Sequence, residues 1–286
     1  MFEAQVWLVT GASRGFGLEI AKAALKAGHK VVACYRTKSK NPSAFEEVEA
    51  LGGTWLQLDV VGKDVESQVQ SVITQHGRID VLVNNAGYAM FGSIEDTNVK
   101  QIETIFKTNF VGALRAIRAV LPSMRSRRSG TIVNISSSLA VHPTPGLGIY
   151  GATKFALEGV TEALQAEIAP FNIRTLLIVP GMMTTDILDS SDTGTGIKIP
   201  LGDAYKGTPV EQTDAGLHNP AFLSMAADPA NVAQRVIEAV DGTGIMAGRE
   251  IGLRVHLGRD TGADLERRAA MYDGLVKNMR DVWESV

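Results

Sequence analysis

Short apolar runs bounded by turn residues alternate with longer amphipathic segments from the N-terminus to about residue 180. The runs are continuous, without regular polar positions, which is typical of strands buried on both faces of a sheet. We expect these strands at 6–9, 31–34, 54–58, 79–83, 131–135 and 174–179. Helical patterns lie between them at 17–27, 43–51, 64–76, 99–124 and 150–169. Strict alternation predicts an α/β fold of three layers, a doubly wound parallel sheet with helices on both faces.

The pattern changes in the last third of the chain. Residues 184–220 are rich in Gly, Thr, Asp and Pro, and so long a segment between periodic elements is usually a functional lid or else disordered. Helical patterns return at 229–240 and 264–283, with a possible last strand at 251–255. We find neither an internal repeat nor a linker. We therefore expect one domain over 1–286, with a substrate lid at about 184–228 and a C-terminal helical extension at about 258–286.

Composition excludes several classes of partner. A net charge of −3 with 21% charged residues provides no basic patch, so we expect no nucleic-acid partner. The one cysteine, Cys34, lies in an apolar run and cannot form an internal disulfide, which favours core packing and a reducing compartment. No apolar stretch approaches 18 residues and no secretory signal is evident, so we expect a cytoplasmic protein with no membrane segment. We also expect no metal site.

A serine cluster at 136–138 follows the fifth apolar run, and Tyr150 and Lys154 come four residues apart after a Pro/Gly loop. In a helix this spacing places the phenol and the ammonium on one face. A cation about 4–6 Å away lowers the pKa of a phenol from its usual value of about 10. With a serine hydroxyl beside them, these groups suit proton transfer to or from an alcohol oxygen. On this motif alone, a half-exposed tyrosine with a solvated lysine is the commoner explanation.

A glycine-rich turn, Thr10 to Gly17, follows the first strand and opens a helix. Glycines there allow a pyrophosphate to approach the backbone, and the helix N-terminus offers unpaired N–H groups. The spacing is G-x-x-x-G-x-G, and a tight turn with close helix packing is the alternative. After the second strand, where dinucleotide folds often carry an acidic residue, this chain has Arg36. A cation there, with Arg14 in the glycine turn, would pair with a 2′-phosphate, which predicts NADP(H) over NAD(H). The alternative is a solvated loop charge.

Three further polar positions follow strands or lie on a helix. Asp59 comes after the third strand, where it would accept from an adenine amino group or cap the helix begun near Gly62. Residues 84–87, Asn-Asn-Ala-Gly, suit close backbone contact with a cofactor or form a plain turn. Asn109 lies on an otherwise apolar helix stripe. A buried amide needs partners, so structural hydrogen bonding is the commoner explanation, and a water-holding amide near a site is the other.

Together these features resemble the short-chain dehydrogenase/reductase family. The matching motifs are TGASRGFG at Thr10–Gly17, NNAG at Asn84–Gly87, Asn109, Ser137, YGATK at Tyr150–Lys154, and PGMMTT at Pro180–Thr185. They occur in family order over about residues 5–186. The resemblance implies a Rossmann fold and an NADP-preferring enzyme of this family.

The resemblance also assigns roles to residues. Tyr150 would be the general acid/base, Lys154 would lower its pKa and bind the nicotinamide ribose, Ser137 would polarise the carbonyl, and Asn109 would hold a water in a proton relay. Ser136 and Ser138 would be structural. The implied cofactor-binding residues are Gly11, Ser13, Arg14, Gly15, Phe16, Gly17, Arg36, Asp59, Val60, Asn85, Ala86, Gly87, Tyr150, Lys154, Pro180, Gly181 and Thr185.

Beyond residue 186 the chain departs from the shortest family members and looks loosely similar to the branch of 17β-hydroxysteroid and retinol dehydrogenases. Apolar candidates for the substrate wall are Met90, Phe91, Leu139, Val141, Pro143, Leu147, Met182, Met183, Ile187 and Leu188. They suggest a lipophilic ketone or aldehyde, although packing within the lid would also explain them. Family habit implies a homodimer or homotetramer.

The leading hypothesis is an NADPH-dependent carbonyl reductase. The alternatives are an NADP+-dependent alcohol dehydrogenase and a catalytically silent NADPH-binding regulatory protein.

Overall fold

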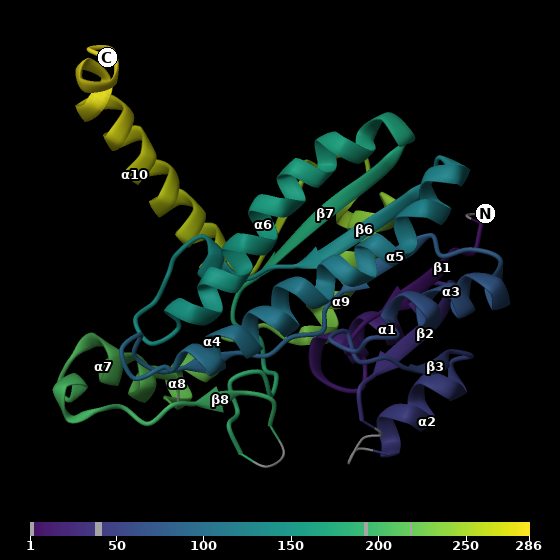
Figure 1. The fold of residues 1–286 in the computed structure, drawn as a ribbon, viewed down its shortest axis with the longest axis horizontal. Coiled ribbons are helices and arrows are strands. Elements are labelled where there is room, and N and C mark those ends of the chain that lie inside the picture. The colour runs from purple at the N-terminus through teal and green to yellow at the C-terminus, as the bar shows by residue number, and fades with distance from the viewer. Residues whose placement is uncertain (1–2, 38–41, 192–193, 218) are drawn as a thin grey trace.

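The computed structural model describes residues 3–37, 42–191, 194–217 and 219–286. Its centre is a seven-stranded sheet of order β3-β2-β1-β4-β6-β7-β9 in which all neighbouring strands are parallel (Figure 1). The strands are β1 (Val6–Val9), β2 (Lys30–Tyr35), β3 (Thr54–Gln57), β4 (Val81–Asn84), β6 (Gly130–Ile135), β7 (Ile173–Pro180) and β9 (Arg254–Leu257). The order reverses direction between β1 and β4, which is the place where such sheets bind ligands.

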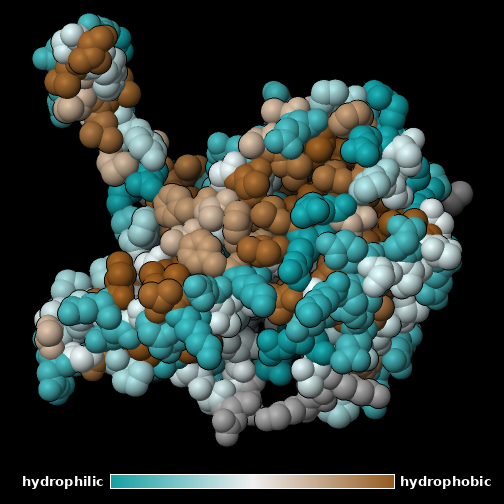
Figure 2. Space-filling view, in the orientation of Figure 1, coloured by the Kyte–Doolittle hydropathy of each residue, from teal (hydrophilic) through white to brown (hydrophobic). Residues whose placement is uncertain are grey.

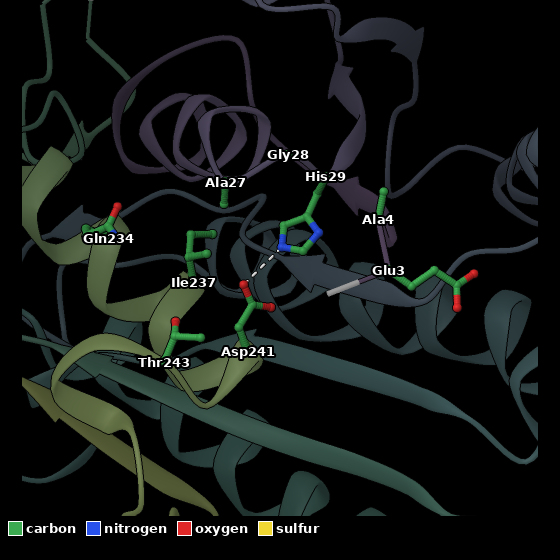
Figure 3. A pocket seen from close by; sticks show the side chains of 9 residues that line it. All are labelled: Glu3, Ala4, Ala27, Gly28, His29, Gln234, Ile237, Asp241 and Thr243. Atoms are coloured by element: carbon green, nitrogen blue, oxygen red, sulfur yellow. Dashed lines mark hydrogen bonds and ion pairs between the residues drawn. The ribbon is translucent and has the colours of Figure 1, made fainter. Parts of the chain in front are cut away.

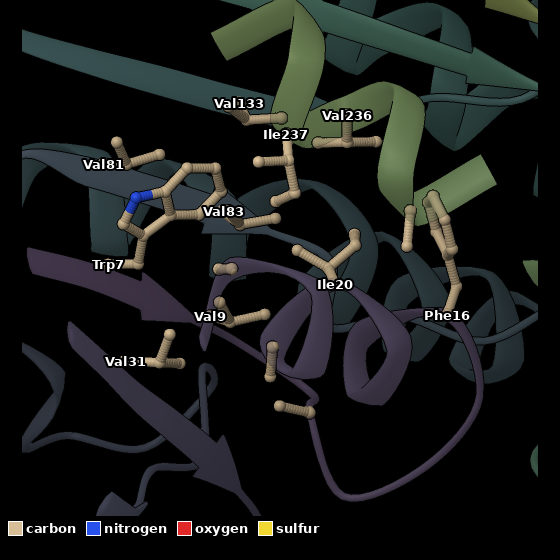
Figure 4. Close-up of a cluster of buried hydrophobic side chains, with 14 of the residues drawn as sticks. Trp7, Val9, Phe16, Ile20, Val31, Val81, Val83, Val133, Val236 and Ile237 are labelled. Atoms are coloured by element: carbon tan, nitrogen blue, oxygen red, sulfur yellow. The ribbon is translucent and has the colours of Figure 1, made fainter. Parts of the chain in front are cut away.

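Helices cover both faces of this sheet, which confirms the three-layer α/β prediction (Figure 1). One face carries α1 (Gly15–Lys26), α2 (Pro42–Ala50) and α9 (Pro229–Asp241). The other carries α3 (Val65–His76), α5 (Gly112–Arg127) and α6 (Gly148–Ile168). Alternate residues of each strand serve the two faces, because side chains along a strand point to opposite sides. In β1, Trp7 and Val9 pack on the α1 side (Figure 4). Leu8 packs on the α3 side.

The last strand lies further along the chain than the sequence pattern suggested. The expected strand was 251–255, whereas β9 is Arg254–Leu257 and pairs with the end of β7 from Leu177 to Pro180. Ile251 is only partly buried and packs against the core without pairing. The apolar residues around Ile251 therefore pack against the core without forming a strand. The strand begins at Arg254, where the chain first pairs with β7.

The expected helix at 99–124 is interrupted. The chain forms α4 (Val99–Phe106), then a π-helical turn at Lys107–Val111, and then α5. A π turn inserts one extra residue into the helix and often marks a functional position. Here the turn contains Asn109, which is 1% exposed. The interruption thus turns a polar side chain into the protein.

The segment 184–228, which we call the lid, has elements of its own. Its strand β8 (Ile197–Lys198) pairs with β5 (Met90–Phe91), a second small sheet. The lid also contains α7 (Pro209–Leu217) and α8 (Pro220–Leu223). Two-residue strands carry no periodicity, so the sequence did not reveal this sheet.

The C-terminal helix α10 (Arg259–Trp283) begins five residues before the expected position of 264 and projects from the body of the molecule (Figure 1). Within the described ranges, none of the helices combines the length and apolar character needed to cross a membrane.

Candidate active site

The turn from β1 into α1 is packed against the end of β4 at two glycines. Gly11 has a φ of +64°, and a Cβ there would lie 2.8 Å from the backbone of the turn after β4. A Cβ on Gly17 would collide with the side-chain amide of Asn85. Gly15 also has a left-handed φ, of +54°, but its Cβ would meet nothing nearer than Thr185 at 3.8 Å. Two glycines therefore permit close packing, and the third borders open space.

The start of α1 fits the pyrophosphate of a dinucleotide. The first-turn amides of a helix lack intrahelical partners and carry the positive end of the dipole. The first turn of α1 contains no acidic residue that would compete for them. Close by, after β4, the Tyr88 hydroxyl is buried with no hydrogen-bond partner among the described residues. An anionic ligand with further polar groups therefore suits this edge.

Thr10 and Asn85 tie the ends of β1 and β4 together. The Thr10 hydroxyl donates to Val83 O and accepts from the N–H groups of Asn85 and Ala86, at 3.0–3.1 Å. The Asn85 side-chain amide donates to the carbonyls of Thr10 and Gly11, at 3.0 Å each. The expected cofactor residues 85–87 thus lie beside the glycine turn, and the amide of Asn85 is committed to holding it.

Arg36 and Asp59 follow the neighbouring strands β2 and β3 and make different contacts. Burial raises the pKa of Tyr88, and the charge of Arg36 acts in the opposite direction, so the guanidinium lies within electrostatic reach of that phenol. Asp59 closes a local turn, because its Oδ1 accepts from Val61 N at 3.1 Å. It does not cap α3, which has Asp64 at its N-cap.

The remaining expected cofactor residues of this end differ in burial. Ser13 and Arg14 lie in the turn, with Arg14 at the N-cap of α1. The side chains of Phe16 and Val60 are 6% exposed and belong to the two hydrophobic cores. We therefore expect those two residues to face a cofactor only through their backbone.

The hydroxyls of Ser137 and Tyr150 meet at the carboxyl end of β6. Ser137 follows β6, and its side chain hydrogen-bonds the phenol of Tyr150, which lies in the first turn of α6. The Ser137 oxygen also accepts from Leu139 N at 3.2 Å. Tyr150 is only 6% exposed. Of the three neighbouring serines, Ser137 is the one that interacts with the phenol, and it is the serine that the family resemblance implied.

Lys154 lies one helical turn beyond Tyr150, on the same face of α6. Its Nζ is 5.7 Å from the centroid of the Tyr150 ring and donates to Ile135 O at 2.8 Å. The side chain is buried beneath the phenol, with 5% of the residue exposed. The backbone carbonyl at the end of β6 therefore fixes the ammonium in this position.

Burial controls the protonation of both groups. It raises the pKa of Tyr150 to about 12, against the opposing effect of the hydrogen bond with Ser137. It lowers the pKa of Lys154 to about 8. The expected lowering of the phenol pKa by the lysine is not found, because loss of water disfavours the charged form of each group. A tyrosine with this pKa keeps its proton near neutral pH and so has a proton to donate, but it is a weaker acid than a free phenol.

Asn109 connects the edge of the sheet to α6. Its Oδ1 accepts from Tyr88 N at 3.1 Å, and its Nδ2 donates to Tyr88 O at 2.9 Å and to Thr153 Oγ1 at 3.2 Å. Thr153 in turn donates to the backbone carbonyl of Tyr150 at 2.7 Å. These bonds are the structural explanation considered above. The water-holding role of Asn109 stays a prediction.

A buried carboxylate that the sequence did not single out stands behind the serines. Ser136 donates to Glu158 Oε1 at 2.5 Å, and Glu158 Oε2 pairs with Arg254 Nε on β9 at 2.8 Å. Glu158 repeats the four-residue spacing of Tyr150 and Lys154 along α6, a signal that would have revealed it. The network joins β6, α6 and β9 directly beside Ser137.

A second unforeseen contact fixes the turn after β7. Asp260, in the first turn of α10, accepts from Met182 N at 2.7 Å, and Gly181 N donates to Leu257 O at 2.9 Å. A Cβ on Gly181 would collide with the Asp260 carboxylate. The expected cofactor residues Pro180 and Gly181 are thus held by the start of α10. No local sequence pattern links residues so far apart.

The expected wall residues fall into several environments. Four share one apolar cluster with Tyr150: Met90, Leu139, Ile187 and Leu188. Met183 packs instead against the core beneath α1 and α9, and Pro143 is exposed. The remaining wall residues are buried or half-buried, namely Phe91, Val141, Leu147 and Met182. Residues on both sides of the β5–β8 pair therefore provide an apolar surface at the phenol.

A cavity of about 200 Å³ lies elsewhere, at the amino ends of the strands (Figure 3). It is lined by Glu3 and Gln234 among others, and His29 Nε2 and Asp241 Oδ2 face each other across 3.0 Å. Because the serine, tyrosine and lysine are at the carboxyl ends, this cavity is not part of the candidate site.

Comparisons with known proteins identify the relatives of this chain. A family model described as short chain dehydrogenase matches residues 5–195. The chain is 42% identical over 206 residues to the oxidoreductase claN of Passalora fulva, covering 72% of this chain and 92% of that protein. It is 34% identical over 259 residues to human retinol dehydrogenase 8, covering 86% and 81%. A solved short-chain dehydrogenase from Streptomyces avermitilis superposes with a TM-score of 0.84 at 33% identity, covering 100% and 99%.

Proposed function

The chain belongs to the short-chain dehydrogenase family, oxidoreductases that act on alcohol or carbonyl groups with a nicotinamide nucleotide, and we propose that it is an NADPH-dependent carbonyl reductase. The observation that carries the proposal is the convergence of Ser137, Tyr150 and Lys154 at one strand end, with a phenol that keeps its proton. Reduction of a carbonyl needs an acid at the nascent alcohol oxygen, and a protonated tyrosine provides it.

We propose a separate role for each residue of the site. Ser137 binds and polarises the carbonyl oxygen, and Tyr150 donates its proton to that oxygen. Lys154 binds the nicotinamide ribose and stabilises the phenolate that remains, and Asn109 holds a water through which the proton is replaced. A bound NADPH supplies the hydride. The segments 11–17, 85–87 and 180–185, with Arg36, Asp59 and Val60, would hold that cofactor.

The preference for NADPH rests on charge at the end of β2. Arg36 takes the position at which NAD-binding folds often carry a carboxylate. A guanidinium pairs with a 2′-phosphate through charge-assisted hydrogen bonds. Its hydrogen bonds with an uncharged 2′-hydroxyl would be weaker. Arg14 at the N-cap of α1 adds a second cation on the same edge.

The preference for a lipophilic substrate rests on the apolar cluster around Tyr150. Residues of β5, of the 3-10 turn after β6 and of the lid form it. Pockets for small molecules are mostly apolar with a few placed polar groups, and here the polar groups are the hydroxyls of Ser137 and Tyr150. We therefore propose that the substrate is a ketone or aldehyde with a largely hydrocarbon skeleton. We also propose that the enzyme is cytoplasmic.

The decisive experiment follows NADPH consumption by the purified protein against matched lipophilic and polar ketones and aldehydes. We expect turnover with the lipophilic members and little with NADH. Arg36→Ala should raise the KM for NADPH about tenfold, the loss of one charge-assisted contact, and leave the KM for NADH unchanged. Lys30→Ala, at the other end of β2, is the control and should change neither.

Three outcomes contradict parts of the proposal. Equal or better turnover with NADH removes the cofactor preference. Faster oxidation of the matching alcohols with NADP+ at neutral pH assigns the protein the reverse reaction. Binding of NADPH without consumption by any carbonyl compound would instead indicate a silent, nucleotide-binding regulatory protein.

A further inference from the structure

Helix α10 is a long arm with little support from its own subunit. Among the described residues, its contacts with the body lie at its root: Thr261 is fully buried, Asp260 binds the turn after β7, and the Arg268 guanidinium lies 5.7 Å from the ring of Phe155 on α6. Past that point the helix leaves the body (Figure 1). A helix of 25 residues is about 37 Å long, so most of its length stands free of the molecule.

This arm carries an apolar stripe with alternating steps of four and three residues. The stripe, which we call the α10 seam, consists of Leu265, Ala269, Tyr272, Val276, Met279 and Trp283. Its five large side chains are 41–54% exposed. Figure 2 shows hydrophobic colouring along the projecting arm. Four–three spacing is the pattern of a coiled-coil seam, because it keeps one face toward a partner helix.

We propose that the α10 seam packs against the α10 seam of a second copy of this chain, as an antiparallel two-helix coiled coil. The inference is independent of the proposed function. It adds an interface to whatever assembly the body of the protein forms.

Side-chain sizes favour the antiparallel direction. Around a two-fold axis near the middle of the helix, Ala269 faces Met279 of the partner subunit, so a small residue meets a large one. Trp283 faces Leu265 of the partner subunit, and Val276 faces Tyr272 of the partner subunit. In a parallel pair, Trp283 would face its own copy and Ala269 would leave a gap, and such voids and crowding both cost stability.

Charges also suit a partner helix better than a lipid surface. Helix α10 contains five basic and five acidic residues, so it lacks the basic excess that draws amphipathic helices to anionic membranes. In the antiparallel pair, Glu266 lies beside Arg280 of the partner subunit at both ends. The two copies of Asp273 would lie close together near the two-fold axis. Each is paired with Lys277 of its own helix, at 2.6 Å, which reduces their repulsion.

The surface at the root of the arm continues the seam. Phe155 on α6 is 38% exposed and stacks against Arg268, which also lies 5.3 Å from the ring of Tyr272. In the antiparallel pair the tip of the partner helix, with its tryptophan, reaches this root. Both ends of the coiled coil therefore find apolar surface, which extends the contact beyond the six seam residues.

The test measures the mass of the full chain in solution by sedimentation velocity and light scattering. Val276→Glu combined with Met279→Glu places charges in the seam, and we expect the assembly mass to fall twofold. Ala270→Glu combined with Asn278→Glu adds the same charge to other faces of α10 and should leave the mass unchanged. Circular dichroism should report equal helix content in both variants. Equal masses for the two variants would overturn the proposal.

The direction of the helices is tested with single cysteines under mild oxidation. In the antiparallel pair, disulfide-linked dimers should form when Ala269→Cys is mixed with Met279→Cys, and neither variant alone should link. Linking of each variant by itself would show a parallel pair. Buried Cys34 does not compete for oxidation. Sedimentation of the wild type with lipid vesicles, lost in the seam variant while its mass stays unchanged, would assign the seam to a membrane and overturn the proposal.

Discussion

The carboxyl edge of the sheet and the lid that borders it are built in opposite ways. At the edge, several polar side chains are buried or half-buried and are held by named partners, as with Asn85, Asn109 and Lys154. Among the described residues of the lid, Ile199 is the one buried apolar side chain, and Met225 is 74% exposed. Densely bonded, buried groups resist change, whereas segments with few buried contacts open at low cost. We propose that the edge determines the reaction and that the lid determines which substrate is accepted.

The largest effect should come from removing the acid at the edge. We expect Tyr150→Phe to lower kcat by about 10³, within the range for a placed general acid, and to leave NADPH affinity unchanged. Tyr205→Phe is the matched change in the lid, where the hydroxyl bonds Glu95 at 2.8 Å. It should change kcat less than threefold. Steady-state kinetics and fluorescence titration of NADPH measure both, and similar losses in the two variants would erase the contrast.

The next effect concerns pH. Because burial lowers the pKa of Lys154 to about 8 from 10.5, the unfolded chain binds more protons at this residue between these values, and the lysine makes stability rise with pH across that window. The contribution of Lys154 to the free energy of unfolding of the cofactor-free protein should increase on the order of 2–3 kcal/mol from pH 8 to 10. Two groups whose pKa is raised in the folded state act in the opposite direction, Cys34 above its usual value of 9.0 and Tyr150 between 10.0 and about 12.

Denaturant unfolding at a series of pH values measures this curve. Lys154→Met should remove the contribution of the lysine to the unfolding free energy between pH 8 and 10. The other titrating groups are the same in both proteins, so the difference between the two curves reports the lysine. A wild-type curve parallel to that of the variant would mean that the lysine is not buried as described.

A smaller effect separates the neighbouring serines. Ser136→Ala leaves one oxygen of the buried Glu158 without its donor, and we expect a loss of about 1–2 kcal/mol in unfolding free energy. Ser138→Ala should be nearly neutral. Thermal and denaturant unfolding compare the two. If Ser138→Ala lowers the unfolding free energy as much as Ser136→Ala, the bonds of Ser136 to Glu158 do not stabilise the end of β6.

The smallest effect is expected in the lid. Leu188 shares the apolar cluster of Tyr150, so Leu188→Ala should raise the KM of a lipophilic ketone about three- to tenfold, as expected for lost hydrophobic contacts. Its kcat should stay within twofold. Met225→Ala, at an exposed lid position, serves as the control and should alter neither constant. If Leu188→Ala lowered kcat as much as Tyr150→Phe, Leu188 would act in the chemical step and not only in substrate binding.

Much of this edge was readable from local patterns. Continuous apolar runs gave the strands in their correct succession, since burial on both faces of a sheet requires such runs. The turn at Gly11–Gly17 and the Tyr150–Lys154 spacing place groups through local geometry alone. The structure brings Tyr150 and Lys154 together with Ser137. The lid and β9 were harder, because their bounds follow from pairing with β5 and β7 and not from periodicity.

The sequence by itself determined the layer order, the family and the residues that meet at the carboxyl edge, because periodicity and turn chemistry act over a few residues. Tertiary structure alone decided the protonation of Tyr150 and Lys154, the bond from Asp260 to the turn at Gly181, and the projection of α10. These depend on which surfaces exclude water and which distant segments touch, and the packed chain as a whole sets both.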